Sequence, residues 1–190
     1  RNFRTQYLSR PGNKNVFEVR AIIFEGPEDY HERINNPGLN IDVNCILVIR
    51  GCGPVGYPGS AEVVNMQPPD SLIRKGILEL PTLGDGRQSG TSGSPSILNV
   101  SPESAIGGGL ALLQTGDRLK IDLNQSSIDV LLNETELQKR RDLLKLEVTE
   151  NQTPWQEIYR NTVGQLSGGG IIELAEKYKK IRHTIPRHSH

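Results

Sequence analysis

The distribution of apolar residues along the chain predicts a mixture of strands and helices. Residues 16–26 (VFEVRAIIFEG) alternate between apolar and polar positions and are rich in β-branched and aromatic residues, which favours a strand. Residues 45–50 (CILVIR) are almost continuously apolar, which is typical of a strand buried on both faces. Residues 77–87 begin as a strand and turn at Asp85-Gly86, and residues 115–132 predict a hairpin around the turn LNQSS.

Helical patterns alternate with these strands. Residues 27–36 start with a proline and two acids and end before Pro-Gly, as a short helix does. Residues 70–77 predict a helix with Asp70 as its N-cap, and residues 133–146 a polar surface helix. Further helices are predicted over residues 60–66 with Ser60 as cap, 153–166, and 169–182. Residues 101–114 start as a capped helical turn and pass through three glycines into an apolar segment.

The order of these elements sets the fold class. Hairpins mixed with helical crossovers predict an α/β fold in which helices flank a mixed sheet or barrel-like core. The 190 residues suit one domain. Residues 1–15 are polar and basic with a Pro-Gly pair, so we expect a linker or arm there and the domain over residues 16–190. Because the chain begins with Arg1, we expect a fragment or a processed product.

Charge and composition exclude several classes of protein. The net charge is +0, so no electrostatic argument favours nucleic acid or an acidic membrane as partner. No apolar run approaches the roughly 20 residues that span a bilayer. The only two cysteines, Cys45 and Cys52, exclude a disulfide framework and match no zinc-binding spacing. We expect reduced thiols in a cytoplasmic protein.

The first candidate for chemistry is a glycine-rich turn after the second strand. Gly51, Gly53 and Gly56 spell G-x-G-x-x-G, the fingerprint of dinucleotide binding. That chemistry needs a helix starting within the motif, which Pro54 and Pro58 prevent. The alternative is that the glycines let the backbone approach a ligand or another segment of the chain, and that the stretch delivers the carboxylate of a nearby residue, Glu62. A first-turn acid that only complements the helix dipole explains Glu62 equally simply.

A second glycine-rich turn follows the next strand. Residues 84–96 (GDGRQSGTSGSPS) place four glycines among several hydroxyl side chains. Composition alone indicates a flexible, solvated loop. A functional interpretation is a loop that holds an anionic substrate and presents a serine Oγ. The stretch around Ser89 lacks the first glycine of the G-x-S-x-G elbow of esterases, and no His-Asp pair is evident to activate this serine.

Taken together, the two turns resemble the C-terminal domain of the dihydroxy-acid and sugar-acid dehydratases. The matching stretches are VIRGCGPVGYPGSAEVVNMQPP, LPTLGDGRQSGTSGSPSILNVSPESAIGGGLALLQTGDRLKID and TPWQEIYRNTVGQLSGGGIIELAEKY. They cover well over half of the chain in the family's order. GYPGSAEVVNM and GRQSGTSGS resemble the pentonate branch, which dehydrates arabinonate or xylonate.

The resemblance implies a fold and a reaction. The fold would be a β-barrel-like core with helices, of the swivelling β/β/α kind. The reaction would be a β-elimination of water from a 2,3-dihydroxy acid, dependent on Mg²⁺ and a [2Fe–2S] cluster. Ser89 would be the base and substrate contact, with Thr91 beside it, and Glu62 one ligand of Mg²⁺. In the C-terminal RHSH, His188 or His190 would reach the substrate as proton donor.

The chain departs from the family in one respect. The family's cluster cysteines and most of its Mg²⁺ ligands precede this domain, and neither Cys45 nor Cys52 matches them. We therefore expect the isolated chain to fold without catalysing, and the intact enzyme to be a homo-oligomer in which the N-terminal domain covers the two turns. Two alternatives stay open: a ligand-binding module without chemistry, and an assembly domain in which Glu62 and Ser89 lie far apart.

Overall fold

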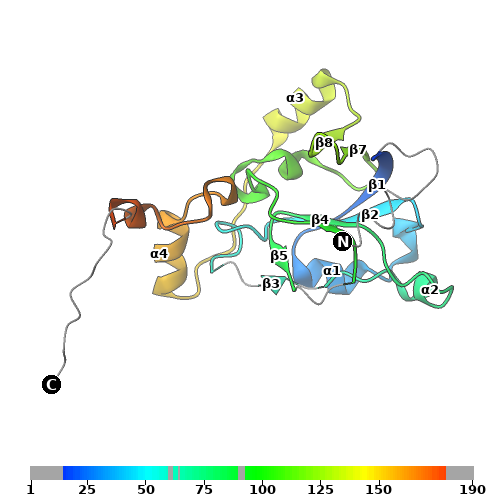
Figure 1. Ribbon diagram of the computed structural model, residues 1–190, viewed down its shortest axis with the longest axis horizontal. Helices are drawn as coiled ribbons and strands as arrows, with labels where there is room; N and C mark the ends of the chain where they lie inside the picture. The colour runs from blue at the N-terminus through cyan, green and yellow to red at the C-terminus, as the bar shows by residue number, and fades with distance from the viewer. Residues whose placement is uncertain (1–14, 60–61, 64, 90–92, 179–190) are drawn as a thin grey trace.

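The computed structural model describes residues 15–178 apart from 60–61, 64 and 90–92. Its main sheet has six strands in the order β6-β4-β2-β1-β7-β8 and curls into a half-barrel (Figure 1). The strands are β1 (Val16–Phe24), β2 (Cys45–Ile49), β4 (Thr82–Gly84), β6 (Ser96–Ile97), β7 (Arg118–Asp122) and β8 (Ser127–Val130). The mixed sheet flanked by helices is confirmed, whereas the expected arm over residues 1–15 lies almost wholly outside the described residues.

Pairing within this sheet changes direction at β1. The strands β1, β2, β4 and β6 run parallel to one another, whereas β7 pairs antiparallel with β1 and with β8. The predicted hairpin over residues 115–132 is the β7–β8 pair. A separate sheet joins β3 (Glu62–Val63) in parallel to β5 (Arg87–Gln88).

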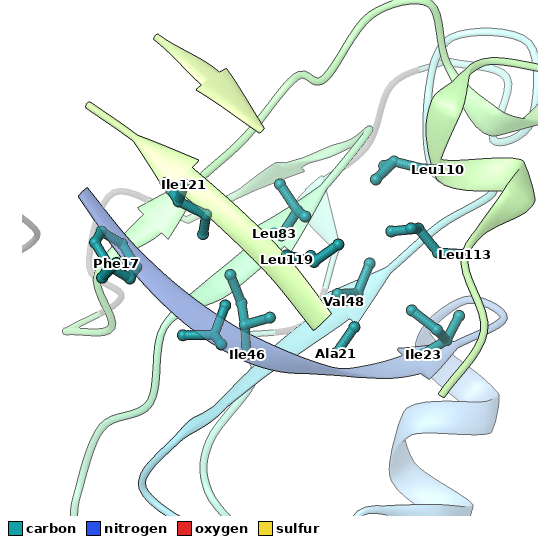
Figure 2. Packing of buried hydrophobic residues seen from close by; sticks show 11 residues of the cluster. Phe17, Ala21, Ile23, Ile46, Val48, Leu83, Leu110, Leu113, Leu119 and Ile121 are labelled. Atoms are coloured by element: carbon teal, nitrogen blue, oxygen red, sulfur yellow. The ribbon is translucent and has the colours of Figure 1, made fainter. Parts of the chain in front are cut away.

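One hydrophobic core fills the inside of the curled sheet. Alternate residues of β1 and β2 enter it, among them Ala21 and Val48, together with Leu83 from β4 and Leu119 from β7. Figure 2 shows these side chains pointing toward a common interior, which Leu110 and Leu113 close at one end. Alternation along a strand sends the intervening residues to the opposite face.

The opposite face of the sheet carries a second core. Ile22 of β1 and Leu47 of β2 pack there against Tyr30 of α1 (Pro27–Arg33) and Leu72 of α2 (Asp70–Ile73). All five residues of β2 are buried, which confirms the prediction of a strand covered on both faces. In the described part of the chain no helix combines the length and the apolar character needed to cross a membrane.

The helical predictions are confirmed only in part. α1, α3 (Glu134–Leu143) and α4 (Pro154–Thr162) lie where the pattern placed them. Residues 101–114 form two short 3₁₀ helices, η3 (Ser104–Ile106) and η4 (Gly109–Leu112), because Gly107 adopts φ 86° and ends the first. The C-terminal helix is the 3₁₀ helix η6 (Glu173–Tyr178), and two further 3₁₀ turns are η2 (Pro37–Leu39) and η5 (Leu166–Gly168).

Two predictions of local structure were wrong. Asp70 is the first residue of α2 and Pro69 its N-cap, because the Pro69 carbonyl oxygen accepts the first hydrogen bonds of the helix, from the N–H groups of Leu72 and Ile73. Residue Glu62 lies in a strand, not in the first turn of a helix. The β-branched Val63 favours extended backbone, and β5 offers it a pairing partner.

Candidate functional site

The two glycine-rich turns leave the same edge of the main sheet. β2 and β4 are parallel neighbours, and Ile49 at the end of β2 is in register with Gly84 at the end of β4. The carboxyl ends of parallel strands meet at one edge, so residues 50–59 and residues 85–89 begin side by side. The fold thus brings together two segments that are well separated in the sequence.

A buried carboxylate, Asp85, joins the two turns. The Asp85 side chain is fully buried and accepts hydrogen bonds from the N–H groups of Cys52 at 2.9 Å and Gly51 at 3.2 Å. It also accepts from the N–H and the hydroxyl of Ser104, at 2.9 and 2.5 Å. A Cβ on Gly86 would lie 2.7 Å from the Cys52 carbonyl oxygen, so only glycine permits this approach of the backbones.

A second buried carboxylate, Glu103, fills the first turn. Its oxygens accept from the N–H of Val55 at 3.0 Å and of Gly56 at 2.8 Å, and from the side-chain amide of Gln165 at 2.7 Å. A Cβ on Gly53 would lie 2.5 Å from the Glu103 Oε2. The G-x-G-x-x-G turn therefore holds one of the protein's own carboxylates, and no helix follows it over residues 57–59. A dinucleotide site needs a helix that starts at this turn, and the structure supports its exclusion because no such helix forms there.

The sequence analysis did not predict that these two carboxylates bind the backbone of the first turn. An acid among glycines and serines is normally solvated, and the backbone donors that bind Asp85 and Glu103 come from positions remote in sequence. The available signal was that Asp85 lies between two glycines at the end of a strand, where close backbone approach is possible.

The strand pairing β3–β5 brings Glu62 close to the segment that carries Ser89. Glu62 is in register with Arg87, and their side chains form an ion pair at 3.6 Å, both about half exposed. Ser89 directly follows β5 and is half-buried. Because side chains alternate along a strand, Arg87 and its partner Glu62 lie on the face of the small sheet opposite the buried Gln88, and Ser89 is the next residue along the chain. The structure thus does not separate the two groups, as an assembly domain would require.

The strand that precedes Ser89 is also tied to the main sheet through side chains. Gln88 contacts the Ser96 hydroxyl at 3.3 Å, and Ser96 accepts from the Thr82 hydroxyl at 2.8 Å. These residues come from β5, β6 and β4, and Gln88 and Thr82 are buried. The chain of polar contacts fixes the position of β5, and with it the point where the Ser89 backbone leaves the strand.

Other predicted site residues lie outside the described part of the chain. Thr91 falls within residues 90–92, and His188 and His190 within residues 179–190. Their expected roles therefore stay predictions.

A cleft of about 870 Å³ lies beside the first turn. Gly51, Gly56 and Tyr57 line one side, and residues 144–150 line the other. Arg50 lies in its wall, bound to Glu25 and, at 2.8–3.1 Å, to the carbonyl oxygens of Leu110, Ala111 and Leu113. Neither Glu62 nor Ser89 lines this cleft.

Metal-binding capacity within the described residues is limited. No three His, Cys, Asp or Glu side chains gather there in a cluster that could hold a metal ion. Cys45 begins β2 and Cys52 follows its far end, and a strand rises about 3.3 Å per residue, so the two sulfurs cannot ligate one iron–sulfur cluster. Both thiols are free and buried. Burial raises the pKa of Cys45, and burial followed by the charges of Asp85 and Glu28 raises that of Cys52 to about 12, so neither is a ready thiolate ligand.

The Cys52 thiol should make stability depend on pH in the alkaline range. The pKa of this thiol in the folded chain lies well above its ordinary value, so folding favours the protonated form. Above pH 9 only the unfolded chain loses this proton, and the free energy of unfolding falls by up to about 1.4 kcal/mol per pH unit from this group. We expect the stability advantage of wild type over Cys52→Ala to shrink between pH 8 and 11 in urea titrations. An advantage that stays constant across this range contradicts the prediction.

Comparisons with known proteins assign the chain to a class of dehydratases. Residues 9–170 match the model of the family Dihydroxy-acid/6-phosphogluconate dehydratase C-terminal, and the chain belongs to this family. It is 60% identical to the D-xylonate dehydratase of Caulobacter vibrioides over 188 residues, which cover 99% of this chain and 32% of that protein.

More distant relatives carry related names. The chain is 42% identical to the L-arabinonate dehydratase of Rhizobium leguminosarum over 125 residues, covering 66% of this chain and 22% of that protein. It is 34% identical to the dihydroxy-acid dehydratase of Clostridium kluyveri over 158 residues, covering 83% of this chain and 28% of that protein. The chain therefore spans about a third or less of the length of these relatives.

Proposed function

We propose that the chain is the C-terminal part of a hydro-lyase that dehydrates a 2,3-dihydroxy sugar acid, such as xylonate or arabinonate, to a 2-keto-3-deoxy acid. The observation that carries the proposal is the 60% identity to a D-xylonate dehydratase over 99% of the chain. The pairing of β3 with β5 supports it, because the pairing places Glu62 and Ser89 in neighbouring segments. A ligand-holding module without chemistry is less favoured, since the relatives carry the names of enzymes.

The reaction assigns a role to each proposed site residue. The Ser89 Oγ, as its alkoxide, takes the proton from C2 and becomes a hydroxyl. The C3–O bond breaks as the hydroxyl on C3 takes a proton from an acid, for which His188 or His190 is the candidate, and leaves as water. The resulting enol tautomerises to the 2-keto acid. Thr91 stands beside Ser89 and helps to hold the substrate or return the proton. His190, in the C-terminal segment, contacts the substrate. Half-burial of Ser89 on a backbone fixed through Gln88 suits a base that must keep its position.

Glu62 would contribute one oxygen ligand to Mg²⁺. An accessible carboxylate at the rim of the turns has the donor chemistry that this ion prefers. A bound Mg²⁺ supplies polarisation of the substrate's carboxylate and hydroxyl oxygens, which acidifies the C2 proton. The Glu62 side chain contacts the Arg87 guanidinium, which holds the carboxylate near the Ser89 segment. One carboxylate does not complete a magnesium site, so we propose that the other ligands come from the N-terminal part of the enzyme.

The cysteines of this chain do not fit a [2Fe–2S] cluster. Cys45 and Cys52 are separated along β2 and buried as thiols, so we propose that the cluster of the intact enzyme is bound by its N-terminal part. Two buried free thiols suit a reducing compartment, and we propose a cytoplasmic location. We expect the intact enzyme to be a homo-oligomer, with residues 16–190 as its C-terminal domain.

Assays of the intact protein and of the isolated 190-residue chain test the proposal. The intact protein should convert at least one pentonate, with release of a 2-keto-3-deoxy acid detected by its reaction with semicarbazide. Its kcat/KM for 2,3-dihydroxyisovalerate should be lower, since the D-xylonate dehydratase that is 60% identical to the chain is named for a sugar acid. The isolated chain should convert neither. Activity of the isolated chain, or a failure of the intact protein on every sugar acid, would overturn the proposal.

A further inference from the structure

The C-terminal region exposes large apolar side chains that the rest of the described chain does not cover. Trp155 and Ile158 of α4 are 78% and 51% exposed, and Leu174 and Tyr178 of η6 are 56% and 62% exposed. No residue of α4 is buried. Figure 1 shows α4 and η6 at the end of the molecule away from α2, and the pairing of Val163 with Ile172 joins the segments that bear them. We call these four side chains the α4–η6 face.

The sequence of α4 explains why this face is unusual. Trp155, Ile158 and Thr162 recur at helical spacing, so one side of the helix is apolar at its start. The polar side attaches the helix to the domain: the Arg160 guanidinium donates to the carbonyl oxygens of Val55 and Thr149, both at 2.8 Å. An amphipathic helix held by its polar side leaves its apolar side for a partner, and exposed groups of large apolar residues mark interaction surfaces.

We propose that the α4–η6 face is the docking surface for the N-terminal part of the same polypeptide. This inference rests on the proposed function. The chain spans only 32% of the length of the D-xylonate dehydratase that it matches, and its family is defined as a C-terminal domain. About two thirds of such a protein therefore lies outside this domain and is available to cover the face.

The position of α4 favours this occupant over a second copy of the chain. Arg160 contacts Val55 within the first glycine-rich turn, so a body docked on the apolar side of α4 lies one helix diameter, roughly 10 Å, from that turn. In the described residues the candidate site has one accessible carboxylate and no cluster of metal ligands, so the body that completes it must reach these turns. The N-terminal part is the occupant that brings ligands, whereas a second copy of this chain brings none.

Oxidative footprinting read by mass spectrometry tests the proposal, and Trp155 is the only tryptophan of the chain. In the isolated chain, hydroxyl radicals should modify Trp155 and Tyr178 rapidly. In the intact protein the modification rate of both should fall at least tenfold, at every protein concentration. Leu78, which is 65% exposed, serves as the control and should react equally in both proteins. Equal reactivity of Trp155 in the two proteins would overturn the inference.

A variant separates docking from folding and from a second copy. Trp155→Ser should lower the Tm of the intact protein while leaving the Tm of the isolated chain unchanged, because Trp155 is mostly exposed there. Leu78→Ser should change neither. If protection of Trp155 instead appears in the isolated chain as its concentration rises, the face binds a second copy and the inference is wrong. None of these readouts depends on product formation, so an active enzyme with an unprotected Trp155 would leave the proposed function standing.

Discussion

Replacing Ser89 by alanine in the intact protein is expected to lower kcat for the sugar acid by a factor of about 10²–10⁴, the contribution typical of a positioned general base. KM should change by no more than a few fold. The reason is that the Ser89 hydroxyl takes the C2 proton only as the reaction proceeds, so its loss removes an interaction made in the transition state. Steady-state kinetics on the most active pentonate measure both constants.

A matched control comes from the same turn. Ser94 donates a hydrogen bond to the Met66 carbonyl oxygen at 3.2 Å and has no proposed part in the chemistry. Ser94→Ala should therefore retain most of the kcat, and both variants should keep the wild-type Tm within a few degrees. If Ser89→Ala instead raised KM and left kcat unchanged, Ser89 would have a binding role. That result would favour a ligand-binding module that does not catalyse a reaction.

The largest effect on stability is expected at Glu103. Alanine there removes the acceptor of two backbone N–H groups in the first turn and of the Gln165 amide, all within a buried region. Loss of a buried charged acceptor that leaves its donors unpaired costs about 3–5 kcal/mol. For a domain of this size we expect the Tm to fall by roughly 6–20 °C. Thermal and urea unfolding of the isolated chain measure the change, with the exposed Glu147→Ala as the neutral control.

A double-mutant cycle makes this prediction specific to the turn. Gly53→Ala in the wild type places a Cβ 2.5 Å from the Glu103 carboxylate and should be destabilising. In a Glu103→Gly background the whole obstructing side chain is gone, including its Cβ, which would lie 2.7 Å from the new Cβ, so the same substitution should cost much less. Additive effects of the two substitutions would show that the glycine is needed for some reason other than this approach.

Local patterns predicted the strands of the main sheet apart from β6, because those strands carry strong signals, whereas β6 begins at the end of a stretch that was expected to be a loop. The continuous apolar run of β2 indicates burial on both faces, and the alternation in β1 indicates burial on one face. The structure buries most of the apolar residues of both strands. The hairpin β7–β8 and the helices α1 and α3 likewise have turn residues or caps adjacent in sequence; Asn133, for example, accepts from the Glu136 N–H at 2.8 Å.

The site was less predictable because its geometry depends on contacts remote in sequence. Val63 pairs with Gln88, and without β5 nothing in the stretch around Glu62 distinguishes a short strand from a helical turn. The glycines identified both turns as positions of close approach. The sequence did not show which atoms approach them. Gly53 admits the side chain of Glu103 and Gly86 admits the backbone of Cys52, and only the folded chain brings these partners together.

The antiparallel pairing of β1 with β7 has a consequence for synthesis of the chain. Val16, at the start of the first strand, pairs with Asp122, and Arg20 pairs with Arg118. A ribosome makes the protein from its N-terminus, so β1 emerges long before the strand that completes one of its two edges. Until then that edge carries unpaired backbone groups, a common starting point for misassembly. Non-local pairing of this kind also slows folding. The domain therefore stays open to chaperones or to unwanted strand addition through much of its translation.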